Sequence, residues 1–495
     1  MSIDNLLQQY RSRMETLFQL RSVSALLDWD QQVNLPVKGA ADRANQLELL
    51  STLVHKAKTD PELMRILCEL YNSLDSLSEP DQVNIRETKI ELEREAKLPE
   101  EYVARVAKAS AECYTAWVRA KKENDFSSIL PLLERNISLA KEKIDLVGYT
   151  ETPYDALLYD FEQGSTLSAI QPPLLALAKG IQAMLPALYE KCPKTTPKTE
   201  HFCLQKQEAL CKHLASQIGY NLDSGRLDTA PHPFMTTLGA HDKRITTRYS
   251  ESDYLSSVLT VLHEAGHAIY EQGLLDEWAG TPMAEAVSLS IHESQSRIFE
   301  NIFGRSKSFA HYIYSILDQY FPEEHAKTSP EHIWQQLNGV HPSFIRVQAD
   351  EVTYSLHVVL RLELEEMIFN QNLPVNELPE AWNAKYEEHL GLKVPSDTLG
   401  VLQDVHWYSV GFGYFPTYAL GNLYSGIMRD AMLAERPDFE ASFQDGDFSF
   451  PLYWLREHVH SQGKRFTGIE LARKLSGEPL SEKPFLSYLK AKFNL

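Results

Sequence analysis

Two histidines and a glutamate form the part of this sequence most suited to chemistry. His263 and His267 are four residues apart, and Glu264 directly follows the first. On an α-helix this spacing is about 400° of rotation, so both imidazoles project from one face. Such a pair can share one Zn²⁺ at about 2.0–2.1 Å from each nitrogen. Glu264 would lie beside the metal and could take a proton from a water whose pKa the metal lowers to about 7.

A catalytic zinc site needs a third protein ligand and one open position. The segment 283–297 offers two candidates, Glu285 and Glu293, and the spacing alone does not choose between them. Glu271 continues the face of His267 at the next turn. Because a helix that turns past the metal carries this residue away, we expect Glu271 to be an exposed acid.

The residues around this motif predict a helix that positions it. Ser252 and Asp253 are typical helix N-caps, and Gly273 can end the helix in a left-handed conformation. Apolar residues flank the motif at positions 259, 262, 268 and 269. Burying two unpaired imidazoles and a carboxylate among them would be costly, so the alternative to a metal site is a pair of hydrogen-bonded core histidines.

Helical periodicity dominates the rest of the chain. Apolar residues recur every three or four positions over 6–18, 46–57, 61–74, 81–95, 100–121 and 127–147. A β-hairpin is expected within 232–249, which is rich in β-branched and aromatic residues. The breaker-rich loop 192–198 joins two halves of similar character. We predict a mainly α-helical fold in one domain, 1–495, with a helical half at about 1–200 and a catalytic half at about 201–495.

The charge balance excludes some classes of protein. The chain has 495 residues, with 48 basic and 68 acidic side chains and a formal net charge of −20. Nucleic-acid binding needs a basic face, so we expect neither nucleic-acid binding nor docking on anionic membranes. The most apolar stretch, 172–189, is interrupted by Lys179 and Gln182 and is too polar to span a bilayer.

The cysteines and the amino-terminal segment indicate the cellular compartment. Five cysteines are spread over the chain without a Cys-x-x-Cys pair, which indicates neither a disulfide framework nor a thiolate zinc site. Charged residues occupy the first positions, where a signal peptide would have its apolar core. We expect a cytoplasmic protein.

Ordered motifs along nearly the whole chain resemble the carboxypeptidase Taq family of metallocarboxypeptidases. We find no departure from the family pattern at the matching positions. These are Leu26-Leu-Asp-Trp-Asp-Gln31, His232-Pro-Phe234, Asp242-Lys-Arg-Ile-Thr246, His263-Glu-Ala-Gly-His267, His292-Glu-Ser-Gln295, Ile345-Arg-Val-Gln-Ala-Asp350, Gly400-Val-Leu-Gln-Asp-Val-His-Trp407 and Gly413-Tyr-Phe-Pro-Thr-Tyr418.

This resemblance implies a single, almost wholly helical domain with a deep active-site cleft, and a homodimer. It implies removal of single residues from the carboxyl termini of peptides, with broad specificity. It also implies Glu293 as the third ligand of one Zn²⁺ per chain, with Glu285 as the fallback. Co²⁺ or Mn²⁺ could substitute, because this ligand set binds several divalent ions.

Roles for further residues follow from the family motifs and the needs of amide hydrolysis. Glu264 would act first as base and then as acid. His406 and Tyr418 would donate hydrogen bonds to the oxyanion, with Tyr414 as a substitute. For the two tyrosines, aromatic packing is the alternative role.

An exopeptidase must also bind a free carboxylate, and the planar guanidinium of arginine suits this task. We choose Arg346. Its alternative role is a salt bridge to Asp350, which would lie one turn away if the segment were helical. Arg244 and Arg248 are the reserves. His232 is a candidate substrate contact, by analogy with a histidine in angiotensin-converting enzyme, a distant helical relative.

Two other readings remain open. An endo-oligopeptidase or peptidyl-dipeptidase would use the same zinc site and differ in carboxylate recognition. A catalytically silent helical binding protein would keep the metal for structure, but a structural zinc site needs no adjacent base. In each of these interpretations the amino-terminal half contains no group of catalytic residues. We expect it to form one wall of the cleft and to limit entry to flexible peptides.

Overall fold

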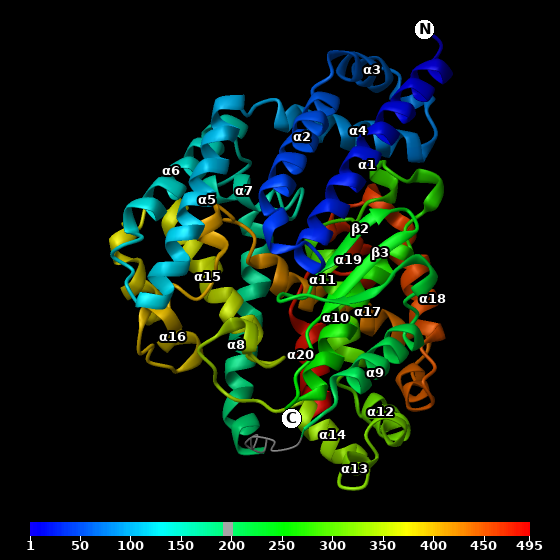
Figure 1. The fold of residues 1–495 in the computed structure, drawn as a ribbon, viewed down its shortest axis with the longest axis vertical. Helices are drawn as coiled ribbons and strands as arrows, with labels where there is room; N and C mark the ends of the chain where they lie inside the picture. Colours follow the sequence, from blue (N-terminus) through cyan, green and yellow to red (C-terminus); the bar gives the residue numbers. More distant parts are fainter. Residues whose placement is uncertain (192–200) are drawn as a thin grey trace.

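The structure, a computed structural model, describes residues 1–191 and 201–495. The predicted loop 192–198 lies outside the described residues. In Figure 1 the amino-terminal helices α1 (Ile3–Val33), α2 (Ala40–Lys58), α3 (Pro61–Tyr71) and α4 (Glu79–Glu95) form the upper part of the molecule. Helices α5 (Glu100–Glu123) and α6 (Leu130–Val147) follow beside them, so the helices predicted in this half are confirmed.

Apolar side chains of α1, α3 and α4 form a small buried cluster of their own, separate from the main core. The main core begins in α5 and α6 and extends to α20 (Lys483–Phe493). The predicted mainly α-helical fold with a small sheet is confirmed. The division into a helical and a catalytic half stays a prediction.

One three-stranded sheet in the described residues covers one side of the metal-site helix. It consists of β1 (Leu227–Thr229), β2 (Met235–Gly239) and β3 (Asp242–Thr247), with β3 in the centre. β2 and β3 are antiparallel, with Met235 opposite Ile245, which confirms the hairpin. β1 pairs in parallel with β3 and was not predicted, because three residues carry too little pattern to indicate a strand.

Helix α10 (Tyr254–Gln272) carries the histidine motif. The Asp253 carboxylate accepts from the backbone N–H groups of Leu255 and Ser256, as expected of an N-cap. The left-handed end predicted at Gly273 is wrong, because its φ is −96°. A glycine is needed there for space instead: a Cβ would lie 2.2 Å from Nδ1 of the buried His460.

Two further helices pack closely on α10 and complete the frame of the site. α11 (Leu289–Arg297) continues into a π-helical turn, Ile298–Phe303, and α17 (Pro416–Glu435) lies against α11. Gly266 allows the close approach of α10 to α11, since a Cβ there would meet the Gln295 carbonyl oxygen at 2.6 Å. Gly421 does the same for α17, where a Cβ would lie 2.7 Å from the Glu293 side chain.

The remaining α-helices surround this frame (Figure 1). They are α7 (Pro153–Leu158), α8 (Leu167–Lys191), α9 (Leu204–Gln217), α12 (Lys307–Tyr320), α13 (Pro322–His325), α14 (Pro330–Leu337), α15 (Tyr354–Phe369), α16 (Leu378–Leu390), α18 (Ser449–His458) and α19 (Gly468–Ser476).

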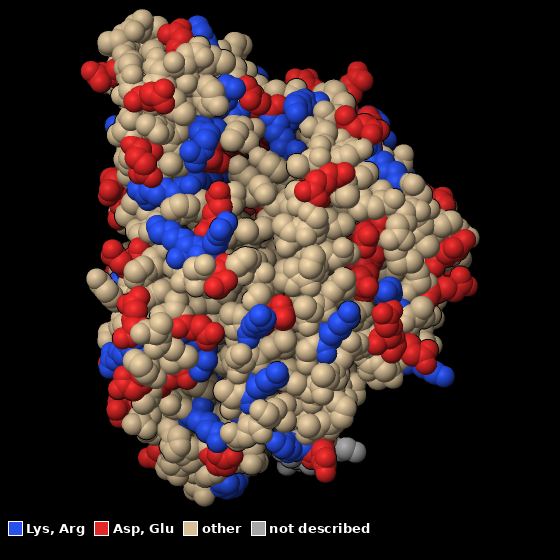
Figure 2. All heavy atoms as spheres, turned by 180° about the vertical axis from the view of Figure 1, so that it is seen from behind, with Lys and Arg blue, Asp and Glu red and all other residues tan. Residues whose placement is uncertain are grey.

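Two hollows lie where the amino-terminal helices meet the catalytic elements. One, of about 280 Å³, is lined by Phe18 and Arg21 of α1 and by Glu271 of α10. The other, of about 550 Å³, is lined by Glu87 of α4 and by Leu289 at the start of α11. On the face drawn in Figure 2, acidic and basic side chains are interspersed. Among the described residues, no helix has the length and apolar character needed to cross a membrane.

Candidate metal centre

Three side chains from two neighbouring helices converge at the predicted metal site. His263 and His267 belong to α10, and Glu293 belongs to α11. One donor atom of each lies within 4.8 Å of the others. Glu293 Oε2 is 3.6 Å from His267 Nε2 and 4.0 Å from His263 Nε2. Since metal–ligand bonds are about 2.0–2.2 Å long, one ion fits between these atoms.

The other two acids considered as ligands lie elsewhere. Glu285 forms an ion pair with Lys464, with Oε2 and Nζ 2.6 Å apart. The expectation that Glu271 is an exposed acid is wrong, because β2 and β3 cover this side of α10. Its side chain is 15% exposed and contacts His292 and Lys243. Burial alone would raise the pKa of Glu271, but these two partners bring it to about 2.

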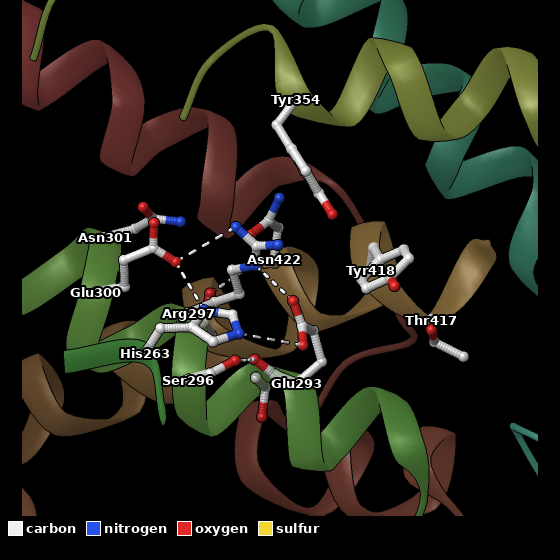
Figure 3. Close-up of polar contacts among 12 residues, drawn as sticks. His263, Glu293, Ser296, Arg297, Glu300, Asn301, Tyr354, Thr417, Tyr418 and Asn422 are labelled. Atoms are coloured by element: carbon white, nitrogen blue, oxygen red, sulfur yellow. Dashed lines mark hydrogen bonds and ion pairs between the residues drawn. The ribbon is translucent and has the colours of Figure 1, made fainter. Parts of the chain in front are cut away.

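A second layer of hydrogen bonds orients each candidate ligand, and Figure 3 shows the contacts made by His263 and Glu293. His263 Nδ1 is 2.8 Å from a Glu300 carboxylate oxygen, and His267 Nδ1 is 2.9 Å from the His292 carbonyl oxygen. Both Nε2 atoms are therefore left for the metal. Arg297 Nε donates to Glu293 Oε1 over 2.6 Å, and Arg297 Nη1 is 3.4 Å from Glu300. Arg297 thus contacts Glu293 directly and is connected to His263 only through Glu300.

Glu264 is buried directly beside the ligands. Burial raises the pKa of its carboxyl group to about 7, although His263 nearby acts in the opposite direction. A carboxyl group with a pKa near neutrality can both accept and return a proton. The donor set of two imidazoles and one carboxylate fits a divalent ion such as zinc, and the adjacent Glu264 fits a catalytic rather than a purely structural site.

The structure brings His406, Tyr414 and Tyr418 together. His406 Nε2 lies 3.4 Å from the Tyr418 hydroxyl, and the rings of Tyr414 and Tyr418 are 5.2 Å apart. Burial lowers the pKa of His406 to about 4, so its imidazole is neutral at neutral pH. Burial raises the pKa of Tyr414 to about 12 and that of Tyr418 further, so both hydroxyls remain donors.

A buried carboxylate on α15 holds the loop that carries these residues. Glu365 accepts hydrogen bonds from Trp407 Nε1 at 2.7 Å, from the Gly413 N–H at 3.1 Å and from the Tyr154 hydroxyl at 2.6 Å. It therefore fixes the chain on both sides of the turn that follows His406. No sequence motif pointed to Glu365, because its three donors come from segments far away in the chain.

Arg346 lies next to Tyr418, with its guanidinium carbon 4.8 Å from the ring centre. The salt bridge to Asp350, the alternative role of Arg346, is not formed, because residues 346–348 form a 3₁₀ turn and the chain then becomes extended. The partner is Asp404, whose carboxylate oxygen is 3.1 Å from Arg346 Nε and 3.0 Å from Nη2. Arg346 Nη1 donates to the Tyr354 hydroxyl over 2.9 Å.

The reserve arginines and His232 form no hydrogen bond or ion pair with this cluster within the described part of the chain. Arg244 is paired with Asp242 through two contacts of 2.8 Å, and its guanidinium carbon lies 4.3 Å from the centre of the Trp29 ring. It ties the sheet to α1. Arg248 and His232 are exposed.

Two positioning residues of α11 and its π-turn were missed by the sequence analysis. Arg297 and Glu300 follow Glu293 by one and two turns, a spacing that a search for second-layer partners could have used. Tyr354 was missed as well. Its ring lies 4.2 Å from the Arg297 guanidinium, and its hydroxyl accepts from Arg346, so it stands between the metal ligands and the arginine.

The comparison with known families agrees with this geometry. The sequence model of the family described as carboxypeptidase Taq (M32) metallopeptidase matches residues 9–493. The chain belongs to this family. It is an enzyme, a metallocarboxypeptidase that acts on peptides, and the reading as a silent binding protein is excluded.

Named members of the carboxypeptidase Taq family match over almost their whole length. "Thermostable carboxypeptidase 1" of Thermus thermophilus is 39% identical, with 99% of this chain and 98% of the relative aligned. "Carboxypeptidase 1" of Bacillus subtilis is 38% identical, over 95% and 94%. The M32 carboxypeptidase from Deinococcus radiodurans has a TM-score of 0.96 at 36% identity, covering 99% of both chains. These relatives do not favour the endopeptidase alternative.

Proposed function

We propose that this metallocarboxypeptidase uses Zn²⁺ held by His263, His267 and Glu293 to release single carboxyl-terminal residues with broad specificity. The observation that carries the proposal is the arrangement of the second layer. It binds both Nδ1 atoms and one oxygen of Glu293, and leaves two Nε2 atoms and Glu293 Oε2 facing one point. A zinc ion held there supplies Lewis acidity to the scissile carbonyl and acidifies water.

Glu264 is the proposed proton carrier. It is buried beside the ligands and has a pKa raised by burial to about 7, so it can accept a proton from the attacking water. It then gives this proton to the amine of the departing residue. The two other described carboxylates that contact the ligands are already engaged, because Glu293 is bound by Arg297 and Glu300 is bound by His263.

Tyr418 and His406 are the proposed donors to the oxyanion, with Tyr414 beside them. The phenol of Tyr418 stays protonated because burial raises its pKa well above the usual value. The neutral His406 lies 3.4 Å from that hydroxyl and can orient it or donate a bond of its own. A donor aimed at developing negative charge typically contributes about 10²–10³ in rate.

Arg346 is the proposed ligand of the substrate's carboxyl terminus. A guanidinium has five N–H groups, and Arg346 uses three of them on Asp404 and Tyr354. One N–H on each terminal nitrogen is left, which matches the two oxygens of a carboxylate. Asp404 and Tyr354 hold the guanidinium in place, so little side-chain entropy is lost when the substrate binds.

Further parts of the proposal concern the surroundings of the site. We assign His232, on the segment before β2, a contact with the bound peptide. The amino-terminal half forms a wall of the cleft and favours flexible peptides over folded proteins. We also propose a homodimer in the cytoplasm that turns over peptides.

Reconstitution with metals tests the proposal. The enzyme is stripped with a chelator and titrated with Zn²⁺, Co²⁺ or Mn²⁺, while bound metal and peptide cleavage are measured together. We expect activity to return in proportion to one bound Zn²⁺ per chain. Full activity of the stripped enzyme, or return of activity at a second ion per chain only, would contradict the proposed site.

A further inference from the structure

Helix α15 carries a buried arginine to which the proposed reaction gives no role. Arg361 is 0% exposed, and its guanidinium carbon lies 4.6 Å from the centre of the Trp382 ring. Its Nε donates to Asp404 Oδ2 over 2.6 Å, and its Nη2 lies 2.6 Å from the same oxygen. Its Nη1 donates to the His357 carbonyl oxygen. All three nitrogens of Arg361 thus face oxygens of the protein.

Asp404 lies between two arginines, with one oxygen facing each. Its Oδ1 is 3.1 Å from Arg346 Nε and 3.0 Å from Nη2, while its Oδ2 accepts from Arg361. Burial alone would raise the pKa of Asp404, but the two guanidinium groups hold it well below its usual range. The carboxylate is therefore charged, and two positive charges share one negative charge. We call these three side chains, which together carry one net positive charge, the two-arginine cluster.

The groups around the two-arginine cluster leave most of this positive charge in place. Burial, together with the arginines, lowers the pKa of His357 well below its usual value, and burial lowers that of His406 to about 4, so both imidazoles are neutral. Lys121 Nζ donates to the Gln403 carbonyl oxygen and brings no negative charge. Glu365 lies one turn further along α15, but its three donors are neutral, and it forms no ion pair with either arginine in the described part of the chain. Burial raises the pKa of Glu365 to about 7, so at neutral pH this group is only partly ionised.

This surplus charge changes what Arg346 can do. Paired with Asp404 alone, Arg346 would belong to a neutral ion pair, and Asp404 would compete with the substrate for its charge. Arg361 binds the other oxygen of Asp404 and leaves the cluster positive. A buried positive charge without a counter-ion is costly, and a bound carboxylate supplies that counter-ion. The arrangement therefore favours an anionic terminus over an amide of the same shape.

We propose that Arg361 is a positioning residue that sets the charge of the carboxylate site. It shares Asp404 with Arg346, and the positive charge that remains selects a peptide with a free carboxyl terminus. The inference rests on the proposed function, in which Arg346 binds that terminus, and adds the residue that keeps Arg346 available to do so.

Competitive inhibition of the zinc-loaded full chain by phenylpropionate and by phenylpropionamide tests this role. The acid and the amide have nearly the same shape, so the ratio of their inhibition constants isolates recognition of the charge. Arg361→Met is expected to weaken binding of the acid about tenfold and to leave the amide unchanged. Arg361→Lys keeps the charge, and its ratio should stay within about threefold of the wild-type value. Arg429→Met, which removes an arginine paired with Glu440 near the end of α17, is the matched control and should leave the ratio unchanged.

The double variant that combines Arg361→Met with Asp404→Asn provides the decisive arm. It removes one positive and one negative charge, so the ratio is expected to return to within about threefold of the wild-type value. It also leaves no unpaired buried carboxylate, so it keeps the test valid if Arg361→Met alone folds poorly.

Three outcomes overturn the inference alone: equal weakening of acid and amide in Arg361→Met, an Arg361→Lys variant as weak as Arg361→Met, or a double variant that does not recover. Each would give Arg361 a purely structural role. A ratio that Arg346→Ala leaves unchanged overturns the carboxylate site of the proposed function, and the inference with it.

Discussion

The proposed metal ligands and the residues proposed to bind the substrate carboxylate lie side by side, but they come from parts of the sequence that differ in extent. The ligands come from two consecutive helices, α10 and α11, and Arg297 and Glu300 hold them from within α11 and the turn after it. The carboxylate side is spread wider. Arg346 is held by Asp404 and by Tyr354, and each lies in a different element.

This difference separates two requirements of the reaction. The proposed metal ligands are held by short-range contacts between neighbouring helices. Changes to the loop that carries Asp404 and His406 should therefore leave metal binding intact. The carboxylate side depends on buried ion pairs between segments that only the whole fold brings together. Tyr354, between Arg297 and Arg346, is the connection between the two sides. The following experiments test whether the sides are separable.

The largest effect is expected from Glu264→Gln. The amide keeps the shape of the side chain but cannot act as a base, so kcat should fall by about 10³ or more. Bound zinc, measured by mass spectrometry of the metal, should stay at the wild-type level. Glu285→Gln is the matched control, since Glu285 pairs with Lys464 away from the ligands and should change kcat little. Loss of zinc from Glu264→Gln would show that Glu264 belongs to the ligand set.

A smaller loss is expected from Arg346→Ala. Removing a fixed cation from a bound carboxylate should lower kcat/KM on free-acid peptides about a hundredfold, with bound zinc unchanged. Arg346→Lys should recover only part of this loss, because an ammonium does not offer two parallel N–H groups. Steady-state kinetics and metal analysis on the same samples provide the check. Zinc loss in parallel with activity would mean that the two sides are not separable.

Glu300→Gln should affect the metal side alone. Without a full negative charge against His263 Nδ1, zinc should bind about tenfold more weakly. A competition titration with a chromophoric chelator measures this change. At saturating zinc, KM for a free-acid peptide should equal that of the wild type, and a raised KM would contradict the separation.

The smallest effect concerns acid stability on the carboxylate side. The pKa of His406 is lowered from 6.5 to about 4 by burial, so the unfolded chain binds a proton below about pH 6.5 that the folded chain refuses until about pH 4. As the pH falls from about 6.5 to about 4, protonation of this group in the unfolded chain should lower the free energy of unfolding by about 1.4 kcal/mol per pH unit. Urea unfolding at several pH values should show a slope that contains this contribution, and His406→Gln should reduce the slope by that amount. An unchanged slope would refute the assignment.

Short-range pattern was enough to predict much of the molecule. Four-residue spacing in one helix indicates two ligands, and the N-cap Asp253 and the periodic apolar residues indicate the helices that hold them. The choice of Glu293 over Glu285 as the proposed third ligand rested on the family resemblance, because a spacing across two helices and a loop does not distinguish them, and the structure places Glu293 next to His263 and His267.

Contacts between residues that are far apart in the chain could not be predicted from the sequence. Glu271 was expected to be exposed, because no local sequence pattern shows that the sheet packs on this side of α10. In the structure, residues of β2 and β3 cover its side chain. The alternative role of Arg346, a salt bridge to Asp350, required a helical segment, but this segment is not helical and the partner, Asp404, is 58 residues away. Gly273 was interpreted as a conformational stop, although His460 makes it necessary for space.

The most direct test of the account is mass spectrometry of one peptide offered with a free and with an amidated carboxyl terminus, each with zinc and with chelator. Zinc hydrolysis combined with carboxylate recognition by Arg346 predicts stepwise loss of single residues from the free-acid peptide only, abolished by the chelator. Cleavage of the amidated peptide at a similar rate, or cleavage at internal bonds, would contradict it.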